Sequence, residues 1–433
     1  MKTFHIIILA IFIVLAIAGV AVFAGLGGIG RTTNNVGTVV IWGTLPHLTM
    51  NAVLESVRET RDDFGDVSYL EKSPATFESD LVEAIASGKG PDLFLLSQDR
   101  ILQNGDKVLR IPYTAIDERT FKDRYISEGE LYLSGDGILG LPFTVDPLVM
   151  YWNRRIFADA GIAKPPEFWD AFFQLSQKMT RRNEANTILR ATVPLGEYAN
   201  VPNAKETLSA LILQAGSRIV VRESDGTMSA SLGKSDTSVK IPPAEAALRF
   251  YTEFSDPSKI DYSWNRALPL AEKEFMAGDL AVYFGFASAL PAIRAANPNL
   301  DFDVSLLPQV RDAKNKATFA NMTALSISRG TANATGAYLA AAALSDTAPL
   351  TILSKAIVLP PVLRTLLSVP PSESYQSTFY QSALISVGWL DPNPEKTEGI
   401  FRDMIENTTS GKSRLYDSVS NAEQEIGNLL RGK

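Results

Sequence analysis

The sequence of 433 residues contains no cysteine and only two histidines, His5 and His47. The lack of cysteine excludes disulfides, thiol nucleophiles and the usual Cys/His zinc sites. A Ser-His-Asp triad would have to use His47, which stands in a turn-like Leu-Pro-His-Leu context without a nucleophile elbow beside it. We therefore expect no catalytic histidine, no bound metal and no cofactor.

Positive charge is also scarce. The chain has 41 Lys and Arg against 48 Asp and Glu, a net charge of −7 and no long basic run. We therefore expect no nucleic-acid partner. Charged residues make up 21% of the chain and hydrophobic residues 45%, which is typical of a well-packed globular protein. The length predicts two or three domains.

One uncharged apolar run, residues 6–26, follows Lys2 near the N-terminus. It is long enough to span a bilayer as a helix, and longer than most signal-peptide cores. An uncleaved signal anchor and a cleaved signal peptide both fit this run, and we prefer the anchor, with its N-terminus inside. In either case the body of the protein is predicted to work outside the cytoplasmic membrane, after a flexible tether that ends near residue 37.

Strand and helix patterns alternate after the tether. Strand patterns occupy residues 38–42, 67–70 and 91–96, and amphipathic helix patterns lie between them. The third strand pattern, PDLFLL, is continuously apolar, which is typical of a parallel sheet covered on both faces. This alternation predicts an α/β lobe. Ligands of such sheets bind beyond the carboxyl ends of the strands, where Thr44 and the segment from Ser97 to Arg100 would lie.

Residues 140–153, GLPFTVDPLVMYWN, predict a strand with one acidic residue, Asp146, among apolar neighbours. A buried charge without partners is expensive, so this carboxylate needs an explanation. In one interpretation Asp146 caps a turn before Pro147. In the other, the strand crosses between two lobes and Asp146 faces the cleft, where it offers charge-assisted hydrogen bonds to a polar ligand.

The second half of the chain continues the mixed pattern. Strands are predicted at residues 280–284, 302–307 and 322–328, and we expect the last two to carry the chain back to the first lobe. A hairpin turn is predicted at residues 224–227. Helices are predicted at residues 333–344 and, with an apolar face from Leu415 to Leu430, at the C-terminus.

Five segments carry a family resemblance through their order and spacing: SGKGPDLFLLSQDR, GLPFTVDPLVMYWNRRIFADAGI, PPEFWDAFFQLSQKMT, YSWNRALPLAEKEFMAGDLAVYFG and VLPP. From Thr38 to its C-terminus the chain resembles extracellular solute-binding proteins of family 1. These are the sugar-binding components of ABC importers, and they include the maltodextrin-binding proteins. The resemblance implies a two-lobed α/β fold of the periplasmic-binding-protein type II, which closes on its solute by hinge motion.

The resemblance also implies a division of the chain and a set of partners. Residues 1–37 would be the signal or anchor and tether, residues 38–145 and 309–352 the first lobe, and residues 146–308 and 353–433 the second. The chain would be a monomeric, non-enzymatic receptor that delivers a sugar or oligosaccharide to the permease subunits of an importer.

In sugar-binding relatives, the positions that match Asp146, Asp99 and Arg100 hold sugar hydroxyls. Trp264 matches the second-lobe side of the cleft and Thr44 a recurrent contact loop. Relatives commonly carry a tryptophan at the position of Ser288, and Leu96 replaces an aromatic residue of the maltodextrin binders. Further expected cleft residues are Ser97, Ser288 and Asn321, and aromatic contact would come from Trp264, Phe286 or Trp389.

Two questions stay open at the level of sequence. Trp389 fits a cleft residue and a packing residue between a lobe and the C-terminal helices equally well. The function also has alternatives, because an anchored carbohydrate receptor without an importer would use the same site. A glycosidase would need a pair of carboxylates that nothing in the sequence singles out.

Overall fold

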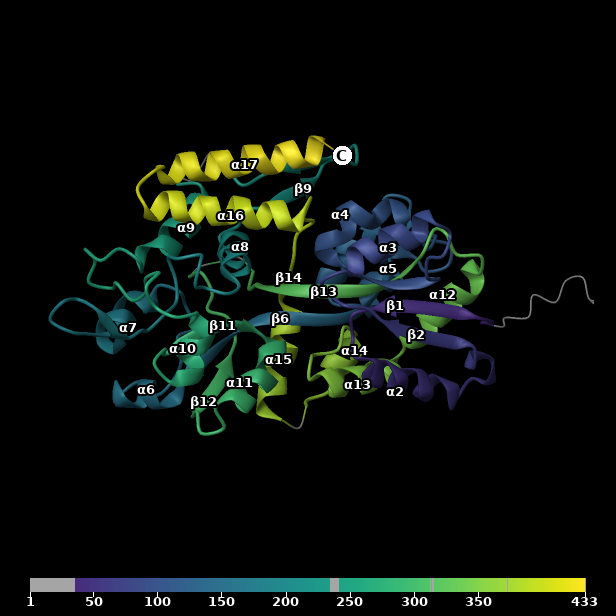
Figure 1. Cartoon of the computed structure of the whole chain (residues 1–433), viewed down its shortest axis with the longest axis horizontal. Coiled ribbons are helices and arrows are strands. Elements are labelled where there is room, and N and C mark those ends of the chain that lie inside the picture. Colours follow the sequence, from purple (N-terminus) through teal and green to yellow (C-terminus); the bar gives the residue numbers. More distant parts are fainter. Residues whose placement is uncertain (1–35, 234–240, 312, 314, 372, 433) are drawn as a thin grey trace, which may run out of the picture.

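Two lobes joined by one mixed sheet make up the protein (Figure 1). The structure, a computed structural model, describes residues 36–233, 241–311, 313, 315–371 and 373–432. Within these residues no helix is both long and apolar enough to cross a membrane. The predicted anchor at residues 6–26 lies outside the described part of the chain.

The main sheet has eight strands, in the order β11-β6-β13-β3-β1-β2, with β12 also paired to β6 and β14 to β13. The strands β1, β2 and β3 are parallel, whereas β6 and β13 are antiparallel to each other and to their other long neighbours. The bounds are β1 (Val39–Gly43), β2 (Val67–Glu71), β3 (Leu93–Ser97), β6 (Leu141–Asn153), β11 (Val282–Phe286), β12 (Phe302–Ser305), β13 (Thr318–Ile327) and β14 (Ser386–Val387).

The first lobe is the predicted α/β unit. Its three parallel strands alternate with helices, and α2 buries the apolar face that its sequence spacing predicts: Met50, Val53, Leu54 and Val57. The helices that pack in its core are α2 (His47–Arg58), α3 (Phe77–Ala86), α4 (Ile101–Asn104), α5 (Glu118–Arg124), α12 (Ala334–Leu344), α13 (Thr347–Ile357) and α14 (Arg364–Leu367). Short 3-10 turns are η1 (Asp62–Phe64), η2 (Gln98–Arg100), η3 (Gly105–Lys107) and η4 (Ser127–Tyr132).

The second lobe is richer in helices. Its two C-terminal helices, α16 and α17, lie side by side along one edge of the lobe (Figure 1). Its helices are α6 (Arg154–Asp159), α7 (Ala171–Met179), α8 (Ala204–Gln214), α9 (Pro243–Glu253), α10 (Ala271–Ala277), α11 (Leu290–Ala296), α16 (Pro394–Thr409) and α17 (Leu415–Arg431), while α15 (Ser374–Leu384) contributes to both cores. The 3-10 turn η5 (Ala287–Ala289) follows β11.

Three small hairpins complete the fold: β4 (Leu133–Ser134) with β5 (Gly137–Ile138), β7 (Arg181–Arg182) with β8 (Ile188–Arg190), and β9 (Val220–Arg222) with β10 (Met228–Ala230). The third of these confirms the turn predicted at residues 224–227, where Gly226 adopts a positive φ of 85°. The predicted helix at residues 333–344 is confirmed as α12, whose first turn is capped by the side chain of Asn333.

The strands β6 and β13 cross from one lobe to the other (Figure 1). Along β6, Phe143 and Val145 pack in the core of the first lobe, whereas Leu148 and the residues after it pack in the core of the second. Along β13, Phe319 belongs to the second core and Ala320 to the first. Both strands therefore change lobes at about the same level.

One strand expectation was wrong. The predicted strand at residues 302–307 is β12, which pairs with β6 inside the second lobe instead of returning to the first. The return is made by β13 alone, which begins at Thr318. The outer lobe boundaries stay a prediction, and Val362, Leu363 and Leu367, which were assigned to the second lobe, pack in the core of the first.

Candidate functional site

A row of polar side chains lies on one face of the crossing strands, at the level where they change lobes. In the ladder between β6 and β13, Asp146 is opposite Asn321 and Thr144 is opposite Thr323. Because residues two apart in a strand share a face, all four side chains point to the same side. Val145 and Met322 alternate with them and are fully buried. The apolar residues thus fill the core while the polar row faces the junction of the lobes.

Hydrogen bonds fix parts of this row. The hydroxyls of Thr144 and Thr323 are 2.6 Å apart and share a hydrogen bond. Thr323 is opposite Ser97 in the ladder between β13 and β3. Ser97 is the last residue of β3 and continues the row. Asn321 is exposed, so its amide is accessible at the surface of the junction.

Asp146 lies inside β6, which continues to Asn153, so the interpretation of Asp146 as a turn cap is wrong. Its Oδ1 accepts a hydrogen bond of 3.0 Å from the backbone N–H of Ser288 in η5. Burial raises the pKa of Asp146 to about 6, and hydrogen bonds from Ser288 oppose that rise. Near neutral pH the group is a partly buried carboxylate with little local compensation, which suits it to a polar ligand.

An aromatic pair borders the carboxylate. Phe286, the last residue of β11, is opposite Leu148 of β6, and Leu148 shares a face with Asp146. Phe319 of β13 shares the same face with Asn321, and its ring centroid lies 6.4 Å from that of Phe286 at an angle of 61°. Phe286 is half-buried. The junction therefore combines an aromatic edge with carboxylate, amide and hydroxyl groups, and we call Thr144, Asp146, Phe286, Ser288, Asn321 and Thr323 the crossing-strand site.

Asp99 and Arg100 lie in η2, directly after β3, and Arg100 connects the lobes. Its Nη2 donates to Glu395 of α16 in the second lobe at 2.5 Å, and its Nη1 donates to Gln103 at 2.9 Å. Asp99 Oδ1 is buried and has no hydrogen-bond partner among the described residues. In this conformation the guanidinium is therefore committed to a protein carboxylate rather than open to a ligand.

The two predicted tryptophans lie in the core of the second lobe. Trp264 is 0% exposed and its indole N–H donates to Asn200 Oδ1 at 3.0 Å. It cannot offer a ring face to a ligand, because the irregular segment that carries it folds back onto Phe254. Trp389 is 5% exposed and stacks on Phe401 of α16, with 6.1 Å between ring centroids. The packing interpretation of Trp389 is confirmed.

Of the predicted residues, the structure therefore brings together Asp146, Phe286, Ser288, Asn321 and, in the next row, Ser97. Thr44 is exposed after β1, on the far side of β3 from the crossing strands. Thr144, Phe319 and Thr323 were not predicted from the sequence. The alternation of polar and apolar residues along TVD and NMT was the available signal for the two threonines, whereas Phe319 is an apolar residue on the polar face and had no such signal.

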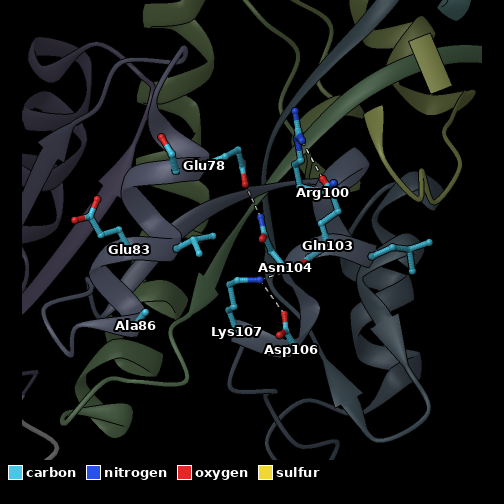
Figure 2. A pocket seen from close by; sticks show the side chains of 11 residues that line it. Glu78, Glu83, Ala86, Arg100, Gln103, Asn104, Asp106 and Lys107 are labelled. Carbon is cyan, nitrogen blue, oxygen red and sulfur yellow. Dashed lines mark hydrogen bonds and ion pairs between the residues drawn. The ribbon is translucent and has the colours of Figure 1, made fainter. Parts of the chain in front are cut away.

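A separate cavity of about 920 Å³ lies on the first lobe between α3 and α4 (Figure 2). Figure 2 shows Asn104 and Glu78 pointing toward each other across it, and they are joined by a hydrogen bond of 2.6 Å. Lys107 likewise pairs with Asp106 at 3.1 Å. The polar groups that line this cavity are largely satisfied by one another, and no residue of the crossing-strand site lines it. We therefore do not place the ligand there.

Comparisons with known proteins agree with this architecture. A cyclic α-maltosyl-1,6-maltose binding protein from Arthrobacter globiformis has a TM-score of 0.74 at 17% identity, covering 92% of this chain and 99% of that chain. A cyclo/maltodextrin-binding protein in complex with maltotetraose has a TM-score of 0.73 at 17% identity, with coverages of 90% and 96%. An ABC transporter solute-binding protein from Thermotoga lettingae bound to α-D-tagatose has a TM-score of 0.67 at 18% identity, with coverages of 91% and 99%.

At these identities the likeness establishes the two-lobed fold. No curated protein that was compared with the chain matches it. The family model described as "Bacterial extracellular solute-binding protein" matches residues 59–378. The chain therefore belongs to the family of bacterial extracellular solute-binding proteins.

Proposed function

We propose that this protein is the extracytoplasmic sugar- or oligosaccharide-binding component of an ABC importer. The ligand binds at the crossing-strand site, and the lobes close over it by bending of β6 and β13. The observation that carries this proposal is the juxtaposition of Asp146 with Asn321 at the level where both strands change from one core to the other.

The chemistry of the site favours a sugar. A pyranose presents C–H faces that pack on aromatic rings and hydroxyl edges that need hydrogen-bond partners. Phe286 supplies an apolar edge, and Asp146, Asn321 and the threonine hydroxyls supply acceptors and donors. The structural neighbours named above are binding proteins for maltose-type oligosaccharides or were solved with tagatose bound, which supports the same ligand class.

The site binds without catalysing a reaction in this proposal. Asp146 is the one carboxylate of the crossing-strand site, whereas glycosidases need two. The protein acts as a monomer at the outer face of the membrane, held there by the apolar N-terminal run or released if that run is cleaved. It delivers its ligand to the permease subunits of the importer.

A thermal-shift screen tests the proposal. The purified protein is heated with mono- and oligosaccharides, and with amino acids, polyamines and metal ions as controls. A ligand present at a hundred times its Kd stabilises the folded state by about 2.7 kcal/mol, which raises the Tm by a few degrees. We expect one sugar series to raise the Tm and to be recovered unchanged after incubation. A shift by a control alone would contradict the sugar proposal, and slow cleavage of the sugar would indicate an enzyme.

A further inference from the structure

The ladder between β6 and β13 contains one irregularity, which lies directly beside the crossing-strand site. Pro142 of β6 is opposite Ala324 of β13, and the next pair is Thr144 with Thr323. Within these two strands, which the structure describes completely, Phe143 has no opposite residue. Phe143 is therefore the extra residue of a β-bulge, in which two residues of one strand face a single residue of the other.

The bulge changes which residues of β6 share a face. In a regular strand the side chains alternate, so Leu141 would share its face with Phe143 and Val145. Because of the extra residue, Leu141 shares its face with Thr144 and Asp146 instead. The residues opposite these three are two apart along β13: Leu325, Thr323 and Asn321.

The register without the bulge would be incompatible with the ligand site. If Phe143 were paired, every later pair would move by one position along β6, and Asp146 would be opposite Ala320 instead of Asn321. Ala320 is 0% exposed and packs in the core of the first lobe, whereas Asn321 is exposed. The carboxylate would then turn into the core, and Val145 would turn toward the junction of the lobes. The bulge therefore decides that Asp146 reaches the ligand site.

The surroundings hold the bulge in place. The Phe143 side chain is 2% exposed and packs in the core of the first lobe. Pro142 has no backbone N–H to leave unpaired where the ladder is interrupted. Two glycines let the flanking segments approach closely: a Cβ at Gly140 would lie 2.5 Å from Ser326 Oγ, and a Cβ at Gly129 of η4 would lie 3.0 Å from Pro142 Cγ. The bulge is thus fixed by its own anchor in the core and by close packing on both sides.

We propose that Phe143 is a positioning residue of the ligand site. Its ring anchors the bulge in the core of the first lobe, and the bulge holds Thr144 and Asp146 on the face that meets the ligand. Loss of the ring would leave a cavity into which the bulge can shift, so these two side chains would no longer be held in place. The consequence for binding rests on the proposed function, whereas the control of the register by Phe143 does not.

Cysteine labelling tests the control of the register without any ligand, because the chain has no cysteine of its own. Val145 is 0% exposed, so Val145→Cys places a single thiol on the core face beside the bulge. The rate of its reaction with a maleimide is measured alone, with Phe143→Ala and with Phe64→Ala. Phe64 is the matched control, since it is 0% exposed in the same core but lies outside the crossing strands. Urea unfolding of each variant corrects the rates for differences in global stability.

We expect the thiol to react slowly alone and with Phe64→Ala, and at least about tenfold faster with Phe143→Ala, because the strand opens locally once the bulge loses its anchor. Equal corrected rates with the two alanine substitutions would overturn the proposal. If Phe143→Ala does not fold, Phe143→Val and Phe64→Val are compared in the same way, with the same two outcomes.

The ligand arm uses the sugar that gives the largest thermal shift. Phe143→Ala should bind it at least about tenfold more weakly than Phe64→Ala, because a charged acceptor is displaced from its hydroxyl partners. Phe143→Leu keeps an apolar anchor and should bind close to wild type. Equal affinities of the two alanine variants, or a loss in Phe143→Leu as large as in Phe143→Ala, would overturn the positioning role. If no sugar binds wild type, the proposed function fails, and the labelling rates still decide whether Phe143 controls the register.

Discussion

At the scale of single residues, Trp264 shows how far a side-chain role can depend on tertiary context. The family resemblance matched it to the second-lobe side of the cleft, but the ring is fully buried and bonded to Asn200. No local pattern distinguishes these outcomes, because an isolated tryptophan outside a periodic segment carries no signal about which way it points. Asp146 was easier to interpret, since a single acid in an apolar strand demands a partner or a ligand.

Trp264→Phe should destabilise the protein without altering ligand affinity. Removing the indole N–H leaves the buried Asn200 oxygen unpaired, which costs about 1–3 kcal/mol in the free energy of unfolding. Urea unfolding measures the loss, and the exposed Tyr416→Phe serves as the control. A variant that unfolds like wild type but binds its sugar more weakly would restore Trp264 to the site.

Asp146 should give the ligand-free protein a pH-dependent stability. Its pKa is raised from 3.8 in the unfolded chain to about 6 in the folded protein. The folded state therefore binds the proton more tightly, and the stabilisation is complete below pH 3.8 and lost as pH rises through 6. Comparison of wild type with Asp146→Asn over this range should reveal a difference of at most about 3 kcal/mol. Parallel curves for the two proteins would show that the pKa of Asp146 is not raised.

At the scale of elements, the sequence predicts the strands and helices of the first lobe well. It predicts poorly which strand carries the chain back from the second lobe to the first. The strands β1, β2 and β3 follow from their short apolar runs, and the amphipathic helix α2 follows from its apolar periodicity. The strand that pairs with β12 cannot be predicted in this way, because a short strand has the same apolar pattern whether it pairs within one lobe or crosses to the other. Similarly, Arg100 looks available in the sequence, but Glu395 that binds it comes from a helix 295 residues further along the chain.

The pair Arg100–Glu395 is predicted to act as a contact between the lobes rather than as a ligand contact. An ion pair of this exposure contributes about 0.2–1 kcal/mol, so Arg100→Ala and Glu395→Ala should each weaken sugar affinity by less than about tenfold. In a double-mutant cycle the two effects should be coupled. If Arg100 binds sugar hydroxyls directly, Arg100→Ala alone should lower affinity by about ten- to a hundredfold. Calorimetric titration of the four proteins separates these outcomes.

At the scale of the whole molecule, polar side chains away from the crossing strands also link the lobes, and two such contacts stand out in the described part of the chain. One is the pair Arg100–Glu395. The other is the hairpin of β9 and β10 on the second lobe, where Arg222 donates to the backbone oxygen of Leu133 at 2.8 Å and Met228 packs against the first core. Together they favour the conformation in which the lobes touch, and opening must break both.

The double variant Arg222→Ala, Glu395→Ala should open the ligand-free protein, because it removes both charged contacts and leaves the crossing strands intact. Small-angle X-ray scattering should record a larger radius of gyration than for wild type. Arg402→Ala, which removes a surface ion pair within α16, should leave the radius unchanged. Equal radii for all three proteins would show that these contacts do not limit opening.

The most direct test of the account is calorimetric titration of wild type and Asp146→Ala with the sugar that gives the largest thermal shift. If the ligand binds at the crossing-strand site, loss of this carboxylate should lower affinity by about ten- to a hundredfold, since its partner hydroxyls lose a charged acceptor. The exposed Asp66→Ala should bind like wild type. Equal affinities for Asp146→Ala and wild type would contradict the account and place the ligand elsewhere on the molecule.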